Sequence, residues 1–144
     1  MQKTKLGITV GALACAVYLA GIFNSTILIL LAGYVLIAET NPWLKRVTVK
    51  AVLIVFLAYA LLYATDFVND VLSIPNYIIR WFDDDYDAFQ LKIPLNLLNI
   101  FDQCVYIAEF VLLALCALKA PKQGTFRFAP IDKLVDKIVV RDEQ

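Results

Sequence analysis

The side chains with the greatest capacity for chemistry lie along the apolar stretch 95–119. Polar residues recur there at steps of three and four, the spacing that places side chains on one broad face of a helix. Glu109 stands well inside this stretch, and Asp102 lies closer to its beginning. An ionisable group near the bilayer centre costs at least a few kcal/mol, so Glu109 is expected to face protein or water. The polar stripe consists of Asn96, Asn99, Asp102, Gln103, Tyr106 and Glu109.

Three interpretations of the polar stripe are open. It could line a pore or a path for protons or cations or bind a ligand, it could hydrogen-bond to neighbouring helices, or it could contact a partner protein. We favour hydrogen bonding between helices, because polar side chains inside membranes commonly serve that purpose.

Enzymatic chemistry finds little support in the sequence. Asp66 and Asp70 are spaced to share a helix face, and with Asp102 and Glu109 they are the plausible acid–base groups. The chain has no His, and its 3 Cys lie in apolar runs. Phosphate-binding loops, nucleophile elbows and zinc-protease motifs are absent from the sequence. We therefore predict no enzyme activity, no cofactor and no metal.

An acidic segment precedes the polar stripe. Asp83, Asp85 and Asp87 have the spacing that opens a calcium-binding loop. Ala88 stands where such a loop needs Gly, and Pro94 stands where it needs Glu. We interpret the segment as a hydrated loop and not as a calcium site.

Composition indicates the environment of the chain. Apolar residues make up 61% of the 144 residues, against roughly 45–50% in a soluble domain. The mean hydropathy is +0.72. A soluble fold of this size would need far more polar surface. The net charge is zero, which gives no basic face for nucleic acid. We therefore predict an integral membrane protein in a lipid bilayer.

Four apolar stretches predict the helices of an all-α membrane bundle. Asn24 and Ser25 separate the first two, which predicts a tight hairpin that either spans the bilayer or re-enters on one side. Asn41 and Pro42 are a typical N-cap and first helical residue. Lys50, inside the third stretch, is expected to extend to the interface. The predicted helices cover residues 6–23, 26–40, 42–72 and 95–119, within a transmembrane domain 1–120.

The distribution of charge predicts the orientation. Lys and Arg flank the first, second and fourth helices on one side, and acidic residues dominate the loop 73–94. The positive-inside rule then predicts a multi-pass protein of the cell membrane with both termini cytoplasmic and this acidic loop outside. Within the loop, the aromatic segment 76–82 is expected to lie in the membrane interface.

Small residues form two ladders near the N-terminus, each at steps of four. Such ladders let helix backbones approach closely in lipid. They predict either an oligomer interface or packing against the second helix of the same chain. The helix-packing ladders are Gly7, Gly11 and Cys15, and Ala12, Ala16 and Ala20.

The cytoplasmic tail 121–144 contains an amphipathic helix. Its apolar residues follow the helical period after Pro130, and Asp132, Lys133, Asp136 and Lys137 cover the other face. The tail is expected to lie on the membrane surface, to bundle with its copies or to dock a cytosolic partner. The predicted docking residues are Ile131, Leu134, Val135 and Ile138.

Together these features favour a small polytopic membrane subunit, non-enzymatic, that acts as an anchor, sensor or assembly factor in a homo-oligomer or with another membrane or cytosolic protein. The alternative is a homo-oligomeric channel lined by the polar stripe. The first hypothesis depends on the small-residue ladders and the tail, and the second depends on the stripe.

Overall fold

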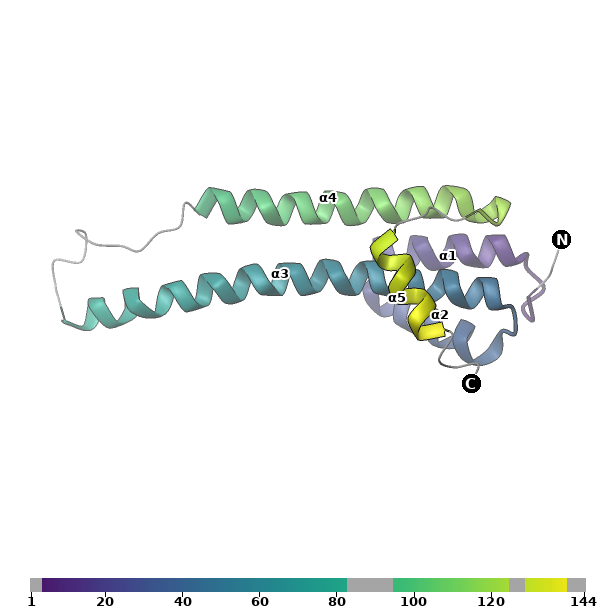
Figure 1. The fold of residues 1–144 in the computed structure, drawn as a ribbon, viewed down its shortest axis with the longest axis horizontal. Helices are drawn as coiled ribbons and strands as arrows, with labels where there is room; N and C mark the ends of the chain where they lie inside the picture. Colours follow the sequence, from purple (N-terminus) through teal and green to yellow (C-terminus); the bar gives the residue numbers. More distant parts are fainter. Residues whose placement is uncertain (1–3, 83–94, 125–128, 140–144) are drawn as a thin grey trace. The chain divides into compact units, whose positions relative to one another are not determined.

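In the computed structural model, residues 4–82, 95–124 and 129–139 are described, and they form helices joined by short connections, with no strand among them (Figure 1). The helices are α1 (Val10–Phe23), α2 (Ser25–Ala38), α3 (Pro42–Phe82), α4 (Leu95–Lys119) and α5 (Ala129–Val139), with a short 3-10 helix η2 (Ala120–Lys122) after α4. The all-helical prediction is confirmed. The acidic residues 83–87 lie outside the described residues.

The tight hairpin between α1 and α2 is confirmed, and Asn24 makes it. The Asn24 backbone N–H donates to the Ala20 carbonyl at the end of α1. Its side-chain oxygen accepts from the backbone N–H of Thr26 at 2.8 Å, at the start of α2. One residue thus caps both helices, which satisfies backbone groups that have no partner within a helix.

Helix α1 begins later than the predicted residue 6. Thr9 is its N-cap, and the Thr9 hydroxyl accepts from the backbone N–H of Ala12 at 3.3 Å. Gly7 precedes the helix with a φ of 79°, a left-handed conformation that favours Gly. Gly7 therefore does not belong to a helical ladder, and that part of the prediction is wrong.

Two helices are long and apolar enough to cross a membrane. The candidate spans are Pro42–Pro75 within α3 and Leu97–Lys122 at α4. Helices α1 and α2 have 14 residues each, which corresponds to about 21 Å against a hydrocarbon core of about 30 Å. Asn41 caps α3 as predicted, since its side chain accepts from the backbone N–H of Leu44 at 3.1 Å.

Helix α3 continues beyond its predicted end at residue 72 and includes the segment 76–82. The predicted interfacial loop segment is therefore the last part of a helix. Pro75 stands inside this helix, although Pro removes a backbone hydrogen bond. In the preceding turn, the Ser73 hydroxyl donates to the Asp70 carbonyl at 2.7 Å.

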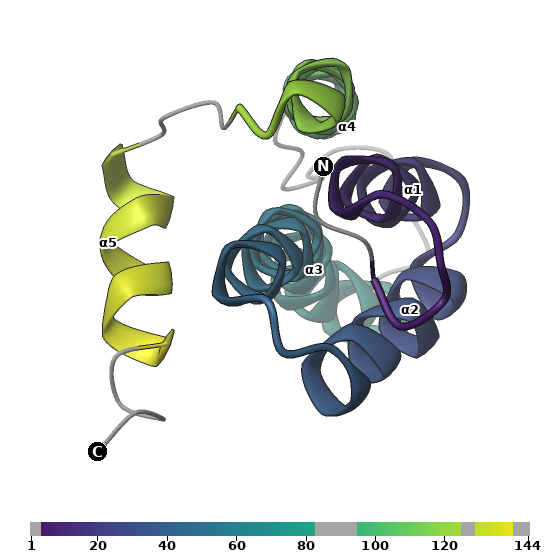
Figure 2. The ribbon, with the colours of Figure 1, turned by 90° about the vertical axis from the view of Figure 1, so that its right-hand side faces the viewer.

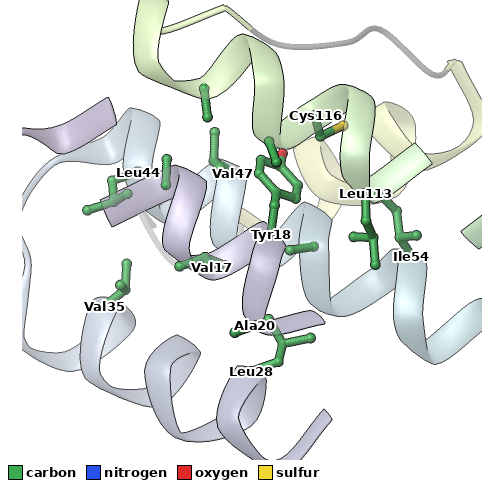
Figure 3. Packing of buried hydrophobic residues seen from close by; sticks show 14 of the residues in the cluster. Val17, Tyr18, Ala20, Leu28, Val35, Leu44, Val47, Ile54, Leu113 and Cys116 are labelled. Carbon is green, nitrogen blue, oxygen red and sulfur yellow. The ribbon is translucent and has the colours of Figure 1, made fainter. Parts of the chain in front are cut away.

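The chain divides into two compact units. One unit combines Met1–Leu57 with Ala108–Gln144, and the other comprises Ala58–Ile107. The first contains the buried core, in which α1, α2, the start of α3 and the end of α4 contribute apolar side chains. Figure 3 shows Tyr18 of α1 directed toward α4, where Cys116 lies, and Leu113 of α4 near Ile54 of α3.

Helices α1 and η2 approach each other closely in this core. Gly11 is buried, and a Cβ placed there would lie 2.8 Å from the carbonyl oxygens of both Ala120 and Pro121. Those oxygens belong to backbone, which cannot move aside as a side chain can. Gly11 therefore sets the distance between α1 and the end of α4.

Gly11→Ala should destabilise the protein by about 1–3 kcal/mol, because the added methyl overlaps two carbonyl oxygens. Gly33→Ala is the matched control, since no atom lies within 4 Å of a Cβ at that helical position. The control should be neutral or stabilise by about 0.5–1 kcal/mol. Unfolding of both purified variants in mild detergent measures the difference, and equal stabilities would contradict the close contact.

Candidate functional site between helices α3 and α5

The site is built around a buried lysine. Lys50 lies on the first part of α3 and is 4% exposed. A buried ammonium is costly unless an opposite charge and hydrogen bonds compensate it. Its Nζ donates to Oδ1 of Asp132, which lies in the first turn of α5. Lys50, expected to extend to the interface, thus meets a carboxylate that α5 brings to it.

Helix α5 is held to α3 by two kinds of contact. Its apolar residues Ile131 and Val135 are buried in the same cluster as Leu44 and Val47 of α3. Its polar side contributes Asp132. Figure 2 shows α5 beside the start of α3, with α1 and α2 on the other side of α3. The apolar face of α5, which the amphipathic pattern predicts, therefore packs against this chain.

A second ion pair lies one turn away and differs in strength. Arg46 Nη1 and Asp136 Oδ1 are 3.8 Å apart, and both side chains are more than half exposed. This separation is too long for a direct hydrogen bond. An exposed pair of this kind contributes roughly 0–1 kcal/mol to stability. Because the two groups are exposed and do not hydrogen-bond to each other, both can still hydrogen-bond to another molecule.

The two ion pairs border a pocket of about 430 Å³. Small-molecule sites commonly have about 300–1,000 Å³. Two cations and two anions face it, so its walls carry no net charge. This mixture of charged and apolar groups suits the pocket to binding a polar small molecule. The lining residues are Trp43, Arg46, Val47, Lys50, Asp132, Val135 and Asp136.

The side chains of the polar stripe of α4 differ in their exposure. Asn99, Gln103 and Tyr106 are exposed, whereas Asp102 and Glu109 are half-buried. The side chain of Asn96 lies outside the described residues. The stripe predicted from sequence therefore divides into an exposed part and a partly covered part.

Asp102 has a partner within the unit Ala58–Ile107. The Thr65 hydroxyl, which is 8% exposed, lies 2.7 Å from Asp102 Oδ1 and 2.7 Å from the Leu62 carbonyl oxygen. A hydrogen bond of this kind between α3 and α4 is what the structural interpretation of the stripe expects. Asp66 and Asp70, the other predicted acidic pair, are both exposed.

The two small-residue ladders face different ways. Gly11 is buried and Cys15 half-buried, and Gly11 packs against η2 and not against α2. Ala12 and Ala16 are exposed, whereas Ala20 is buried. Gly11 therefore packs within the chain, whereas Ala12 and Ala16 of the second ladder stay exposed.

The predicted docking residues of the tail are also divided. Ile131 and Val135 are buried and Leu134 is 42% exposed, and the side chain of Ile138 lies outside the described residues. The two buried residues are unavailable to a partner while α5 is docked on α3.

Sequence reasoning missed the pairing of Lys50 with Asp132, which are 82 residues apart. The available signal was Lys50 itself, a cation inside an apolar stretch that requires a counter-charge. Among the described residues, no group of three or more His, Cys, Asp or Glu side chains is placed to hold a metal ion.

Comparison with known proteins gives no match to a protein-family model, a curated protein or a solved structure. The functional interpretation therefore depends on the geometry of the chain itself.

Asp132→Asn should loosen α5, because it removes the negative charge beside the buried Lys50. We expect a loss of about 1–3 kcal/mol in stability, below the cost for a fully buried pair, because Asp132 is partly exposed. Asp136→Asn is the control and should cost at most about 1 kcal/mol. Hydrogen exchange of the α5 amides, followed by mass spectrometry, reports docking of the helix.

A double variant separates charge from packing. Lys50→Met combined with Asp132→Leu replaces the ion pair by apolar side chains and should restore protection of α5. If Asp132→Asn and Asp136→Asn had equal effects on α5, the buried pair would not be what holds the helix.

Proposed function

We propose that the chain is a non-enzymatic subunit of a membrane assembly, either with its own copies or with another protein. The observation that carries this proposal is the exposure of Asn99 and Gln103 on α4, a helix apolar enough to span a bilayer. Amide side chains cannot be satisfied by lipid tails. A second chain that covers them would supply hydrogen bonds to both side chains.

The membrane placement is supported by the apolar side chains that the fold leaves outside. Phe56 and Tyr63 on α3, and Leu97 and Ile107 on α4, are among the large side chains that are about half exposed or more. Exposed apolar surface of this extent marks contact with a membrane or a partner. The two candidate spans then cross the bilayer, and both termini are cytoplasmic by the positive-inside rule.

In this placement, the hairpin of α1 and α2 is a re-entrant element that enters the bilayer without crossing it. Each helix is about 21 Å long, shorter than the hydrocarbon core of about 30 Å. Both termini of the hairpin lie on the side where α3 begins. This arrangement supports two full crossings, by α3 and α4, with the hairpin inserted from the cytoplasmic side.

The exposed α4 face is the proposed contact with the second chain. The tail is a weaker candidate, since Ile131 and Val135 are buried against this chain. The exposed alanines of α1, Ala12 and Ala16, offer a further surface for close helix approach. The roles that fit are those of an anchor, a sensor or an assembly factor.

A homo-oligomeric channel is the second candidate, and the same exposed amides favour it. In a closed ring of identical chains, Asn99 and Gln103 would face water instead of a neighbouring helix. Glu109, half-buried on the same helix, would influence passing ions.

Gln103→Trp should break the proposed assembly, because a bulky side chain cannot fit in a packed polar contact. Leu97→Trp is the control, since Leu97 is 63% exposed and lies on a different face of α4. Native mass spectrometry from mild detergent should give a larger complex for the wild type and the control, and a single chain for Gln103→Trp. A wild-type protein that is a lone chain with no partner would overturn the proposal.

Conductance separates the two candidates. If the chain forms a channel, Asn99→Leu and Glu109→Gln should change the current or the ion selectivity in planar bilayers, because both remove polar groups from the path. Unchanged currents in both variants would exclude the channel and leave the subunit proposal intact.

A further inference from the structure

The pocket between α3 and α5 has the charge pattern of a site for a zwitterion. Arg46 and Lys50 contribute positive charge, and Asp132 and Asp136 contribute negative charge. A purely anionic ligand would meet two carboxylates, and a purely cationic one would meet two cations. A ligand that carries both charges can place each one opposite its complement.

The two ion pairs differ in what they leave for a ligand. Lys50 is buried and bonded to Asp132, so this pair serves as the floor of the site. Arg46 and Asp136 stand 3.8 Å apart, beyond hydrogen-bond distance. A ligand that bridges them would replace one weak ion pair by two charge-assisted hydrogen bonds, which are roughly twice as strong as neutral ones.

The chemistry of the open pair indicates which charges fit. The planar guanidinium of Arg46 matches the two oxygens of a phosphate. The Asp136 carboxylate accepts hydrogen bonds from a primary ammonium. Trp43 lines the same pocket, and its indole face attracts a cation and suits the membrane interface.

We propose that this pocket binds the headgroup of a zwitterionic phospholipid with a primary amine, of the phosphatidylethanolamine type. Arg46 holds the phosphate, and Asp136 with Trp43 holds the ammonium. The inference rests on the membrane placement proposed above, because the start of α3 must lie at the interface for a headgroup to reach it.

The binding of this headgroup has a structural consequence. The cationic half of the site belongs to α3, and the anionic half belongs to α5. A bound headgroup therefore ties the two helices together and adds to the docking that the buried pair provides. By linkage, whatever favours docked α5 also favours the bound lipid.

Lipid retention tests the proposal in the full chain. The protein is reconstituted in nanodiscs of equimolar phosphatidylethanolamine, phosphatidylcholine and phosphatidylglycerol, released into mild detergent, and its bound lipids are counted by native mass spectrometry. We expect phosphatidylethanolamine to be retained about tenfold over phosphatidylcholine, whose trimethylammonium cannot donate to Asp136. Retention of all three lipids in equal amounts, or of phosphatidylglycerol above the others, would overturn the proposal.

Variants locate the bound lipid. Arg46→Gln and Asp136→Asn should each lower retention of phosphatidylethanolamine about tenfold, since each removes one charge-assisted hydrogen bond. Lys45→Gln and Lys137→Gln are the controls, because neither residue lines the pocket. Equal retention in pocket variants and controls would place the lipid elsewhere and overturn the proposal.

A soluble headgroup separates this inference from the membrane placement. Glycerophosphoethanolamine, added to the protein in detergent, should compete with the retained lipid in the wild type. If the soluble headgroup bound the pocket while no lipid was retained, the lipid proposal would be wrong. The assembly of chains through α4 is tested separately, by the native mass of the Gln103→Trp variant.

Discussion

The constraint on which the rest of the structure depends is an excess of apolar side chains over what the chain can bury. Phe23 and Ile37 at the ends of the hairpin helices, and Leu118 at the end of α4, are more than three-quarters exposed. In water this would promote aggregation. A bilayer tolerates such exposure, and it requires that backbone hydrogen bonds close within each segment, as they do in helices. The all-helical fold satisfies that requirement.

The same constraint explains why Lys50 is paired with a carboxylate of the tail helix α5. A lysine near the start of an apolar helix needs a counter-charge when the surroundings exclude water. Asp132 supplies it, and Ile131 and Val135 place α5 where the carboxylate can reach. The tail is therefore part of the folded unit, and the pocket between α3 and α5 exists because the tail is docked.

Local signals predicted the helices well. Asn24 and Asn41 are caps whose side chains bond the backbone as their types suggest. The long-range contacts could not be predicted. An amphipathic pattern shows which face of α5 is apolar, but it does not show what covers that face. Helical periodicity places Asn99 and Asp102 on one broad face, but it does not show that Thr65 hydrogen-bonds to Asp102. Helix α3 continues beyond the predicted residue 72 and contains Pro75, although Pro removes a backbone hydrogen bond.

The most direct test of the membrane account is the environment of the exposed apolar face of α3. Spin labels at Phe56, Tyr63 and Phe67, in a chain whose three native Cys are replaced by Ala, would be measured in bilayers with oxygen and with a water-soluble nickel complex as relaxing agents. The account predicts strong relaxation by oxygen and weak relaxation by nickel at all three positions. Strong relaxation by nickel at all three would show that this face meets water, and it would contradict the account.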